Sequence, residues 1–289
     1  MNIRHVYVTQ QGTRLGKTGE RLVVKLPDDS TEDYSLVHLR SILISVRGVS
    51  VSTDLMVQCA QRDISLEVLD FDTTAAARLT GKRLRKPGLL RAQVGLSAAD
   101  SLNTARALIS EQVVRRRSLL RYLRRSAVDP STIERSCERM SRRLDQVRSA
   151  HSIAQLMGLE GSCARAYWRG IATTVDTGVF ETRIGRGAKD TSNAMLNYGY
   201  AVLRSRILGM VERVGLEPTI GFLHSDREGR VSLVLDLMEP WRVIVEDAAF
   251  SLLRRHAGRF ESQRQATRMT ADAVVARLEA EPDGEASTV

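Results

Sequence analysis

The chain has 289 residues, of which 43% are hydrophobic and 27% are charged, and its formal net charge is +9. This length allows one large core or two modest ones, and the apolar runs fall far short of the roughly 20 residues that a membrane-spanning helix needs, so we expect a two-domain cytoplasmic protein with no membrane contact and no secretory signal. The three cysteines are widely spaced and odd in number, which argues against a disulfide framework and against a structural zinc cluster.

Residues 1–84 carry the pattern of short strands separated by turns. Apolar, β-branched runs predict strands at 3–8, 22–26, 42–46 and 65–69. Residues 75–79 are expected to pair with the last of these strands. Turn residues gather at Gly16–Gly19 and at Pro27–Ser30, and residues 52–62 have one apolar face at helical spacing. We therefore expect a small N-terminal β-sandwich domain.

The hydrophobic period becomes helical from about residue 92, which predicts an α+β fold with a larger, mostly α-helical domain over 92–278. Residues 85–91, which contain Pro87-Gly88, are expected to form a linker. Long helices are predicted over 97–126, from Ser131, around Glu160, over 193–214 and over 241–256. Ser131 and Glu134 have the spacing of a capping box. The acidic, polar residues 279–289 predict a disordered tail.

Positive charge is concentrated in residues 82–148, where 17 Lys or Arg face 6 Asp or Glu, a net charge of +11. Such a stretch attracts phosphate backbones, so double-stranded DNA is the expected partner, although a solvated helix surface would show the same charge. Aromatic residues make up only 4% of the chain, which favours backbone contacts over base stacking. Arg115, Arg116 and Arg117 lie on the predicted basic outer face of the 97–126 helix.

Glu160 falls in the middle of an apolar helical face. Projecting the segment at 100° per residue places this carboxylate on an arc with Ile153, Met157, Ala164, Tyr167 and Trp168. A buried, unpaired carboxylate costs several kcal/mol, so Glu160 must be protonated, bound to a cation, or paired with Arg165 or another basic side chain. The helix alone does not decide between these alternatives.

A second cluster of acid and imidazole groups follows in the sequence. His224 lies twelve residues before Asp236, and Glu239 lies three residues further on. A helix that begins near Asp236 would project both carboxylates from its first turn. Each residue has an ordinary explanation, since Asp236 suits a helix cap, Glu239 suits a first turn, and His224 suits a loop. Together with Glu160, they form a ligand set suited to Mg²⁺ or Mn²⁺, the cations that phosphodiester chemistry uses.

Four segments together resemble the spacer-acquisition endonuclease of CRISPR systems: Leu156–Gly161, Asp190–Tyr200, Gly221–His224 and Asp236–Arg242. They occur in the order typical of that family, and the resemblance extends to Tyr7–Thr9 near the start of the chain. It implies a β-sandwich domain joined to a helical catalytic domain, a homodimer, and assembly with the small second subunit of the adaptation complex.

The resemblance also implies roles for particular residues. Glu160, His224 and Glu239 match the metal ligands of the family, and Asp236 matches an acid that either binds the metal or orients a ligand. The segment before Asp190 lacks the prolines common in the family, so Arg183 and Arg186 are expected only as DNA contacts. Asp190 and Asn193 are expected either to cap the following helix or to support the active site.

The implied reaction is transesterification, in which the 3′ hydroxyl of a captured DNA fragment attacks a phosphodiester at the edge of a CRISPR repeat. Water in place of the hydroxyl would give nuclease activity from the same site. Two other functions stay open at this point. One is a structure-specific DNA repair nuclease, and the other is a catalytically silent DNA-binding scaffold in which Glu160 and His224 are structural.

Overall fold

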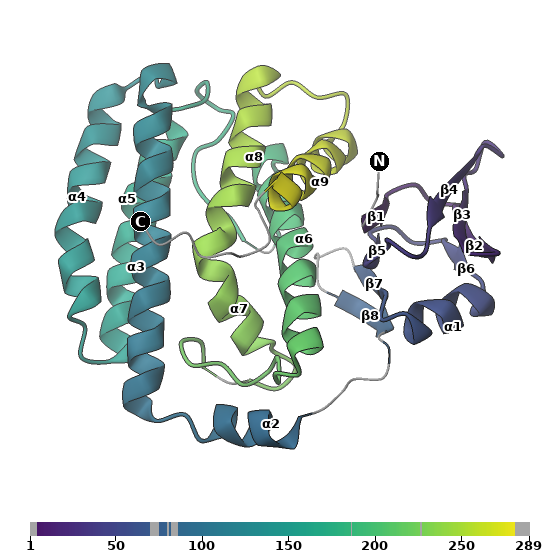
Figure 1. The fold of residues 1–289 in the computed structure, drawn as a ribbon. Helices are drawn as coiled ribbons and strands as arrows, with labels where there is room; N and C mark the ends of the chain where they lie inside the picture. The colour runs from purple at the N-terminus through teal and green to yellow at the C-terminus, as the bar shows by residue number, and fades with distance from the viewer. Residues whose placement is uncertain are drawn as a thin grey trace. The chain divides into compact units, whose positions relative to one another are not determined.

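The computed structural model describes residues 5–69, 75–79, 81, 86–185, 187–225 and 227–280. The chain divides into two compact units, residues 1–85 and residues 86–289. Strands dominate the first unit and helices the second (Figure 1), which confirms the predicted α+β class with its N-terminal β-rich part. Among the described residues, no helix is long and apolar enough to cross a membrane.

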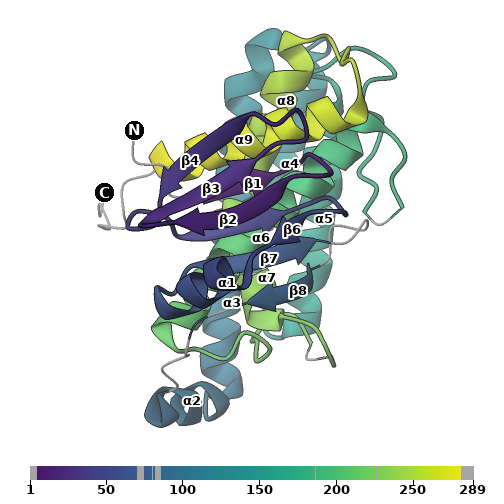
Figure 2. The same cartoon turned by 90° about the vertical axis from the view of Figure 1, so that its right-hand side faces the viewer.

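Two four-stranded sheets build the N-terminal unit (Figure 2), one in the order β1-β5-β7-β8 and the other in the order β4-β3-β2-β6. The strands are β1 His5–Val8, β2 Arg14–Thr18, β3 Arg21–Lys25, β4 Thr31–Ser35, β5 Ser41–Ile44, β6 Ser50–Val51, β7 Ser65–Leu69 and β8 Ala75–Leu79. One core joins both sheets to helix α1 (Thr53–Gln61), because Leu22, Ile42 and Leu55 are buried in the same cluster. Strands β7 and β8 pair, as predicted, and their pairing is antiparallel.

The turn predicted at Gly16–Gly19 lies further along the chain. Strand β2 continues through Gly16 to Thr18, where Thr18 pairs with Arg21 of β3. Gly19 has a φ of 55° and begins the two-residue turn with Glu20. The structure thus uses only the second glycine for its left-handed backbone, since a glycine within a short strand merely lacks a side chain to pack.

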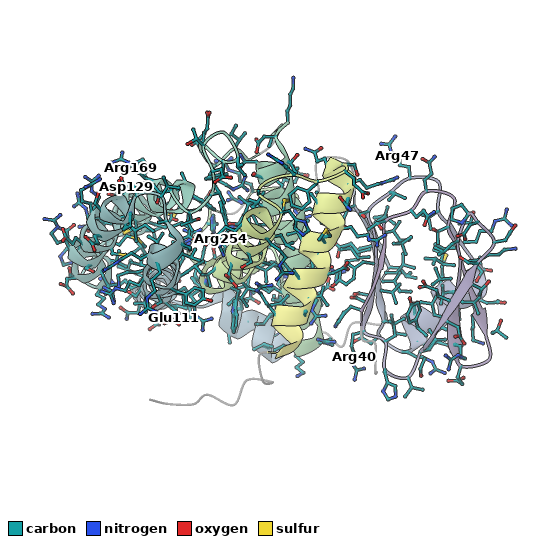
Figure 3. The ribbon with its side chains drawn as sticks, turned by 90° about the horizontal axis from the view of Figure 1, so that it is seen from above. Arg40, Arg47, Glu111, Asp129, Arg169 and Arg254 are labelled. Carbon is teal, nitrogen blue, oxygen red and sulfur yellow. The ribbon has the colours of Figure 1, made fainter. Side chains whose placement is uncertain are left out.

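Helices make up the second unit: α2 Pro87–Val94, α3 Ala98–Leu123, α4 Pro130–Arg148, α5 Ile153–Ala172, α6 Thr191–Val214, α7 Ser232–Met238, α8 Arg242–Arg255 and α9 Gln263–Ala280, with short 3₁₀ turns η1 Arg124–Ser126 and η2 Glu239–Trp241. Helices α3, α4 and α5 pack together, and α6, α8 and α9 form a second group. Helix α3 contacts η2 and α8, so it joins the two groups. Figure 3 shows Asp129 and Arg169 at one end of the α3–α4–α5 group.

Three predictions about this unit were wrong in detail. Helix α2 covers most of the predicted linker, because Pro87 suits the first turn of a helix. The cap of α4 is Asp129, whose carboxylate accepts a hydrogen bond from the Thr132 amide, while Glu134 pairs with Arg124 instead of completing a capping box. Helix α9 runs to Ala280, past the predicted start of the tail, and residues 281–289 lie outside the described residues.

Gly199 lets α6 and α8 approach each other closely. A Cβ at this position would lie 2.5 Å from Cγ1 of Val245 and 3.4 Å from Cγ2 of Thr270. Both neighbours belong to buried residues of α8 and α9, so neither side chain has room to retreat. The small residue thus sets the spacing between helices that carry pocket residues.

We expect Gly199→Ala to destabilise the protein by about 2 kcal/mol, because the added methyl overpacks this helix crossing. Gly158→Ala is the matched control, since a Cβ there meets no atom within 4 Å. It replaces a helical glycine by alanine, so it should stabilise the protein by up to about 1 kcal/mol. Urea denaturation of the wild type and both variants measures these changes. Equal denaturation midpoints for the two variants would show that the α6–α8 crossing can accommodate an added methyl group.

Candidate active site

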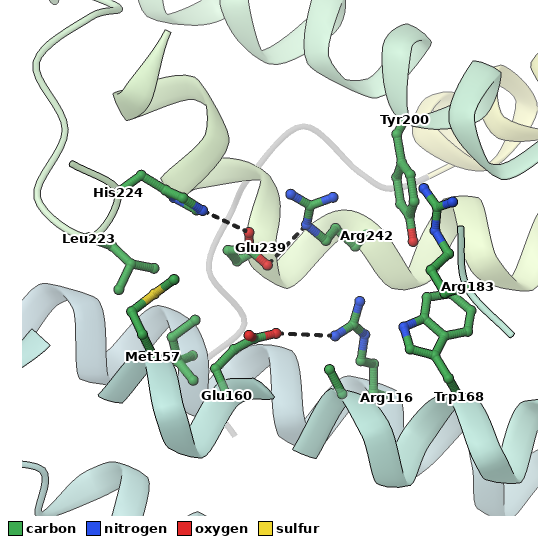
Figure 4. Close-up of a pocket in the computed structure, with 12 residues that line it drawn as sticks. Arg116, Met157, Glu160, Trp168, Arg183, Tyr200, Leu223, His224, Glu239 and Arg242 are labelled. Carbon is green, nitrogen blue, oxygen red and sulfur yellow. Dashed lines mark hydrogen bonds and ion pairs between the residues drawn. The ribbon is translucent and has the colours of Figure 1, made fainter. Parts of the chain in front are cut away.

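A cavity of about 260 Å³ in the helical unit is lined by all three expected metal ligands, Glu160, His224 and Glu239 (Figure 4). Its walls come from α3, α5, α6, η2, α8 and the loop before α7. The lining residues include an acidic and imidazole group of Glu160, His224 and Glu239 and a guanidinium group of Arg116, Arg183 and Arg242, together with Met157, Trp168 and Tyr200. Segments more than a hundred residues apart in the sequence therefore contribute to one site.

Asp236 fixes both the backbone and the imidazole ring of His224. The buried carboxylate of Asp236 accepts hydrogen bonds from the backbone amides of Phe222, Leu223 and His224, at 2.7, 3.0 and 2.9 Å, and lies 2.6 Å from Nδ1 of the imidazole. Gly221 permits this wrapping, because a Cβ there would lie 2.7 Å from the Asp236 carboxylate. With Nδ1 occupied, Nε2 is the nitrogen presented to the pocket.

The sequence suggested a helix that begins near Asp236 and has this residue in its first turn. The structure differs. Helix α7 begins at Ser232, so Asp236 falls in its second turn, and Glu239 begins η2. The three-residue spacing still turns both carboxylates toward His224. Oε1 of Glu239 lies 3.9 Å from Nε2 of His224, and Oε2 accepts hydrogen bonds from Nε of Arg242, at 3.0 Å, and from the amide of Gln112.

Glu160 projects into the cavity from α5, with its side chain 22% exposed. Burial raises the pKa of its carboxyl group, and the negative charge of Glu239 adds to this, while the guanidinium of Arg116 opposes it. Nη1 of Arg116 lies 3.7 Å from Oε1 of Glu160, which makes Arg116 the paired basic residue (Figure 4). Arg165, the partner considered from the sequence, is exposed on the surface.

Arg116 belongs to a buried network that sequence reasoning missed. Its guanidinium donates to both carboxylate oxygens of Glu246 on α8, at 2.6 and 3.2 Å, and lies over the ring of Tyr167 at 4.9 Å. The hydroxyl of Tyr200 donates to the same carboxylate at 2.8 Å. Burial alone would raise the pKa of Glu246, but these partners lower it. A signal existed in the sequence, since Glu246 interrupts the apolar face of its helix as Glu160 does.

The three consecutive arginines of α3 point in different directions, which corrects the predicted basic outer face. Arg116 is 5% exposed and has the partners described above. Arg115 pairs with Glu111 and lies 4.7 Å from the ring centre of Trp241, while Arg117 donates to the hydroxyl of Ser141 on α4. Because successive residues of a helix are 100° apart, three adjacent side chains cannot share one face.

Arg183 reaches the cavity from the segment before α6. Its guanidinium donates to the amide oxygens of Asn193, at 3.1 Å, and Asn197, at 2.6 Å, and stacks over Tyr200 at 5.3 Å. Asp190 is the N-cap of α6 and accepts a hydrogen bond from the Asn193 amide at 2.8 Å. Asn193 thus lies in the capped first turn of α6, and its side-chain oxygen accepts a hydrogen bond from Arg183, which lines the cavity. Arg186 lies outside the described residues.

The donor set of the pocket fits a hard divalent cation. Two carboxylates and one imidazole nitrogen line the same cavity, and Cys163, the nearest cysteine in sequence to Glu160, has its pKa raised to about 11 by burial, which disfavours a thiolate ligand. Oε1 of Gln112 is buried beside Glu239 and has no hydrogen-bond partner among the described residues, as suits an acceptor for a metal-bound water. Within the part of the chain that the structure describes, no three His, Cys, Asp or Glu side chains converge closely enough to hold a metal in this arrangement, and Glu160 is paired with Arg116.

The fold and this pocket describe a two-unit protein whose helical part sets a histidine and two carboxylates beside buried arginines. Residues 6–280 match the family described as CRISPR associated protein Cas1, and the chain belongs to that family. A protein of Francisella tularensis subsp. novicida, named CRISPR-associated endonuclease Cas1 1, is 33% identical over 256 residues, which cover 87% of this chain and 79% of that protein. These matches confirm the resemblance and the expectation of a CRISPR-associated nuclease.

Solved structures share the fold. A casposase bound to integration product superposes with a TM-score of 0.82 at 19% identity, covering 98% of this chain and 85% of that chain. A chain of a Cas6-RT-Cas1–Cas2 complex superposes with a TM-score of 0.78 at 17% identity, covering 98% of this chain and 33% of that chain. The architecture of both units is therefore one that other proteins also adopt.

We expect Glu160→Gln to raise the melting temperature of the metal-free protein by a few degrees at about pH 7.5. The raised pKa of Glu160 means that its charged form is disfavoured in the folded state, so stability is lost as the pH rises through that pKa, whereas glutamine stays neutral. At about pH 3.5, below the ordinary pKa of a glutamate, the wild-type carboxyl is mostly protonated in both states, so the two proteins should differ much less. Differential scanning calorimetry at both pH values measures this, and a lower melting temperature for the variant at pH 7.5 would contradict it.

Proposed function

We propose that this protein is a metal-dependent DNA endonuclease and integrase that inserts captured DNA fragments into a CRISPR array. The observation that carries the proposal is the meeting of Glu160, His224 and Glu239 in one cavity, next to guanidinium groups that suit phosphate. A Mg²⁺ or Mn²⁺ ion is the proposed cofactor. When bound, it would neutralise phosphate oxygens and stabilise the leaving 3′ oxygen.

The residues of the chain have separate tasks in this mechanism. Glu160, His224 and Glu239 would hold the cation, and Asp236 would keep the imidazole in the tautomer that presents Nε2. The attacking 3′ hydroxyl forms a bond to phosphorus while the bond to the repeat's 3′ oxygen breaks, so no nucleotide cofactor is consumed. Water as the attacking group would leave a nick instead.

The partners follow from the family and remain part of the proposal. Double-stranded DNA fits the net charge of +11 in residues 82–148. A small second subunit is supported by the Cas6-RT-Cas1–Cas2 complex, whose chain shares this fold. We also propose that the protein forms a homodimer and acts in the cytoplasm.

A catalytically silent scaffold is the main rival, and the metal ligands decide between the two. We expect His224→Ala, Glu239→Ala and Glu160→Ala each to lower Mn²⁺-dependent strand joining by at least about 100-fold, because each removes a direct ligand. Asp236→Asn should be nearly as severe, since the buried amide cannot accept all the hydrogen bonds that Asp236 accepts. Strand joining on a labelled repeat substrate measures the rates.

Arg165→Ala is the control for these variants, because this arginine is exposed on the same helix as Glu160. It should join strands at close to the wild-type rate. Wild-type activity in folded Glu160→Ala and His224→Ala proteins would overturn the proposed site. A repair nuclease would instead cleave branched DNA as readily as a repeat and would join no strands.

Arg183 is the DNA contact for which the structure provides the best argument. Burial lowers the pKa of its guanidinium, which shows that the charged form is poorly solvated. Its guanidinium donates to neutral oxygens, the side-chain amides of Asn193 and Asn197 and the backbone carbonyl of Ile184, and among the described residues no carboxylate forms an ion pair with it. A partly desolvated cation with neutral partners is stabilised by an incoming anion, and a DNA phosphate is the anion that the proposed reaction supplies.

We expect Arg183→Gln to weaken binding of a 3′-overhang duplex about 5-fold and to reduce the slope of log K against log salt by about 0.7 to 0.9, the value of one lost phosphate contact. Arg169→Gln removes the same charge from an exposed position of α5 and is the control. Fluorescence anisotropy across a salt series measures both slopes. An unchanged slope for Arg183→Gln, or an equal change in both variants, would remove Arg183 from the DNA path.

A further inference from the structure

Gln93 joins helix α2 to the loop that leads to His224. Its amide nitrogen donates hydrogen bonds to the carbonyl oxygens of Glu217 and Ile220, both at 2.9 Å, and its amide oxygen accepts one from the backbone amide of Glu217, also at 2.9 Å. One side chain thus uses both ends of its amide to fix a short turn that lies 124 to 127 residues away in the sequence. Figure 1 shows α2 beside the loop that connects α6 and α7.

Helix α2 has little else to hold it. None of its residues is buried, and Val94 is 63% exposed. In the described part of the chain, Gln93 makes all the side-chain hydrogen bonds that run from α2 to other elements. A polar side chain with three well-placed partners is therefore the principal specific contact between α2 and the loop.

The fixed turn ends where the histidine segment begins. Ile220, whose carbonyl Gln93 binds, is followed by Gly221 and by the amides of residues 222–224 that wrap the Asp236 carboxylate. This wrapping requires Gly221 to pass within van der Waals distance of Asp236 and Ser232. A displacement of Ile220 would therefore displace His224, four residues later, because the close packing of Gly221 against Asp236 and Ser232 leaves the backbone between them little room to adjust.

We propose that Gln93 is a positioning residue for His224. Asp236 orders residues 222–224 from the inside, and Gln93 orders residues 217–220 from the outside, so the histidine is constrained on both sides. The role in metal binding rests on the proposed function, while the ordering of the loop does not.

Gln93→Leu tests the proposal, because leucine keeps a similar volume and removes all three hydrogen bonds. Hydrogen exchange of the metal-free protein is measured first, and amides 222–224 should exchange about 10-fold faster than in the wild type, as expected when about 1.4 kcal/mol of local order is lost. Mn²⁺ affinity is measured next, by the electron paramagnetic resonance signal of free Mn²⁺. It should fall about 5-fold, less than the 10- to 100-fold typical of a side chain that contacts a ligand directly.

Val94→Ala is the matched control on the same helix and should change neither reading. Gln93→Asn keeps the amide but is one methylene too short to reach both carbonyls, so it should behave like Gln93→Leu should the leucine variant fail to fold. Unchanged exchange at residues 222–224 in the folded variant overturns the proposal. If His224→Ala leaves Mn²⁺ affinity unchanged, the proposed ligand set is wrong, and the exchange result still decides the role of Gln93.

Discussion

The ion pair between Arg116 and Glu246 is the interaction on which the helical unit depends most. It joins α3 to α8 inside the protein, where Glu246 is fully buried and Arg116 is 5% exposed. Removing one member of such a pair leaves an uncompensated buried charge, at a cost of about 3–5 kcal/mol. The pair is thus a strict requirement for the crossing of α3 and α8, whatever its net contribution to stability.

The same pair also sets the electrostatics of the cavity. Glu246 balances Arg116 from the inner side, and Tyr200 completes the coordination of that carboxylate. The outer side of Arg116 then faces Glu160. Burial and the charge of Glu239 disfavour the ionised form of Glu160, and Arg116 partly offsets both effects. A cation that binds Glu160 must therefore compete with a guanidinium that is anchored elsewhere. In the metal-free protein, Glu160 is thus paired with Arg116 at 3.7 Å, and a bound cation would replace this contact.

Patterns in the sequence predicted the elements well where a local period determines them. The strands around Val23 and Leu66 and the helix around Glu160 follow from alternation and from a 3.6-residue repeat. The direction of Arg116 could not be predicted in this way, because its partner Glu246 is 130 residues away. Likewise, Asp129 displaced Ser131 as the cap of α4 because both residue types suit the position and the following proline decides the register.

The division of work between Asp236 and Glu239 follows from counting hydrogen bonds. A carboxylate has about four acceptor sites, and Asp236 faces four nitrogen atoms, three from the backbone and Nδ1 of His224. Its capacity is filled without a cation. Oε1 of Glu239 faces the cavity 3.9 Å from Nε2 of His224, while only Oε2 is engaged by Arg242 and Gln112. Of two acids three residues apart, Glu239 therefore keeps one oxygen open to the cavity, whereas Asp236 is fully engaged with the backbone and imidazole of the histidine segment.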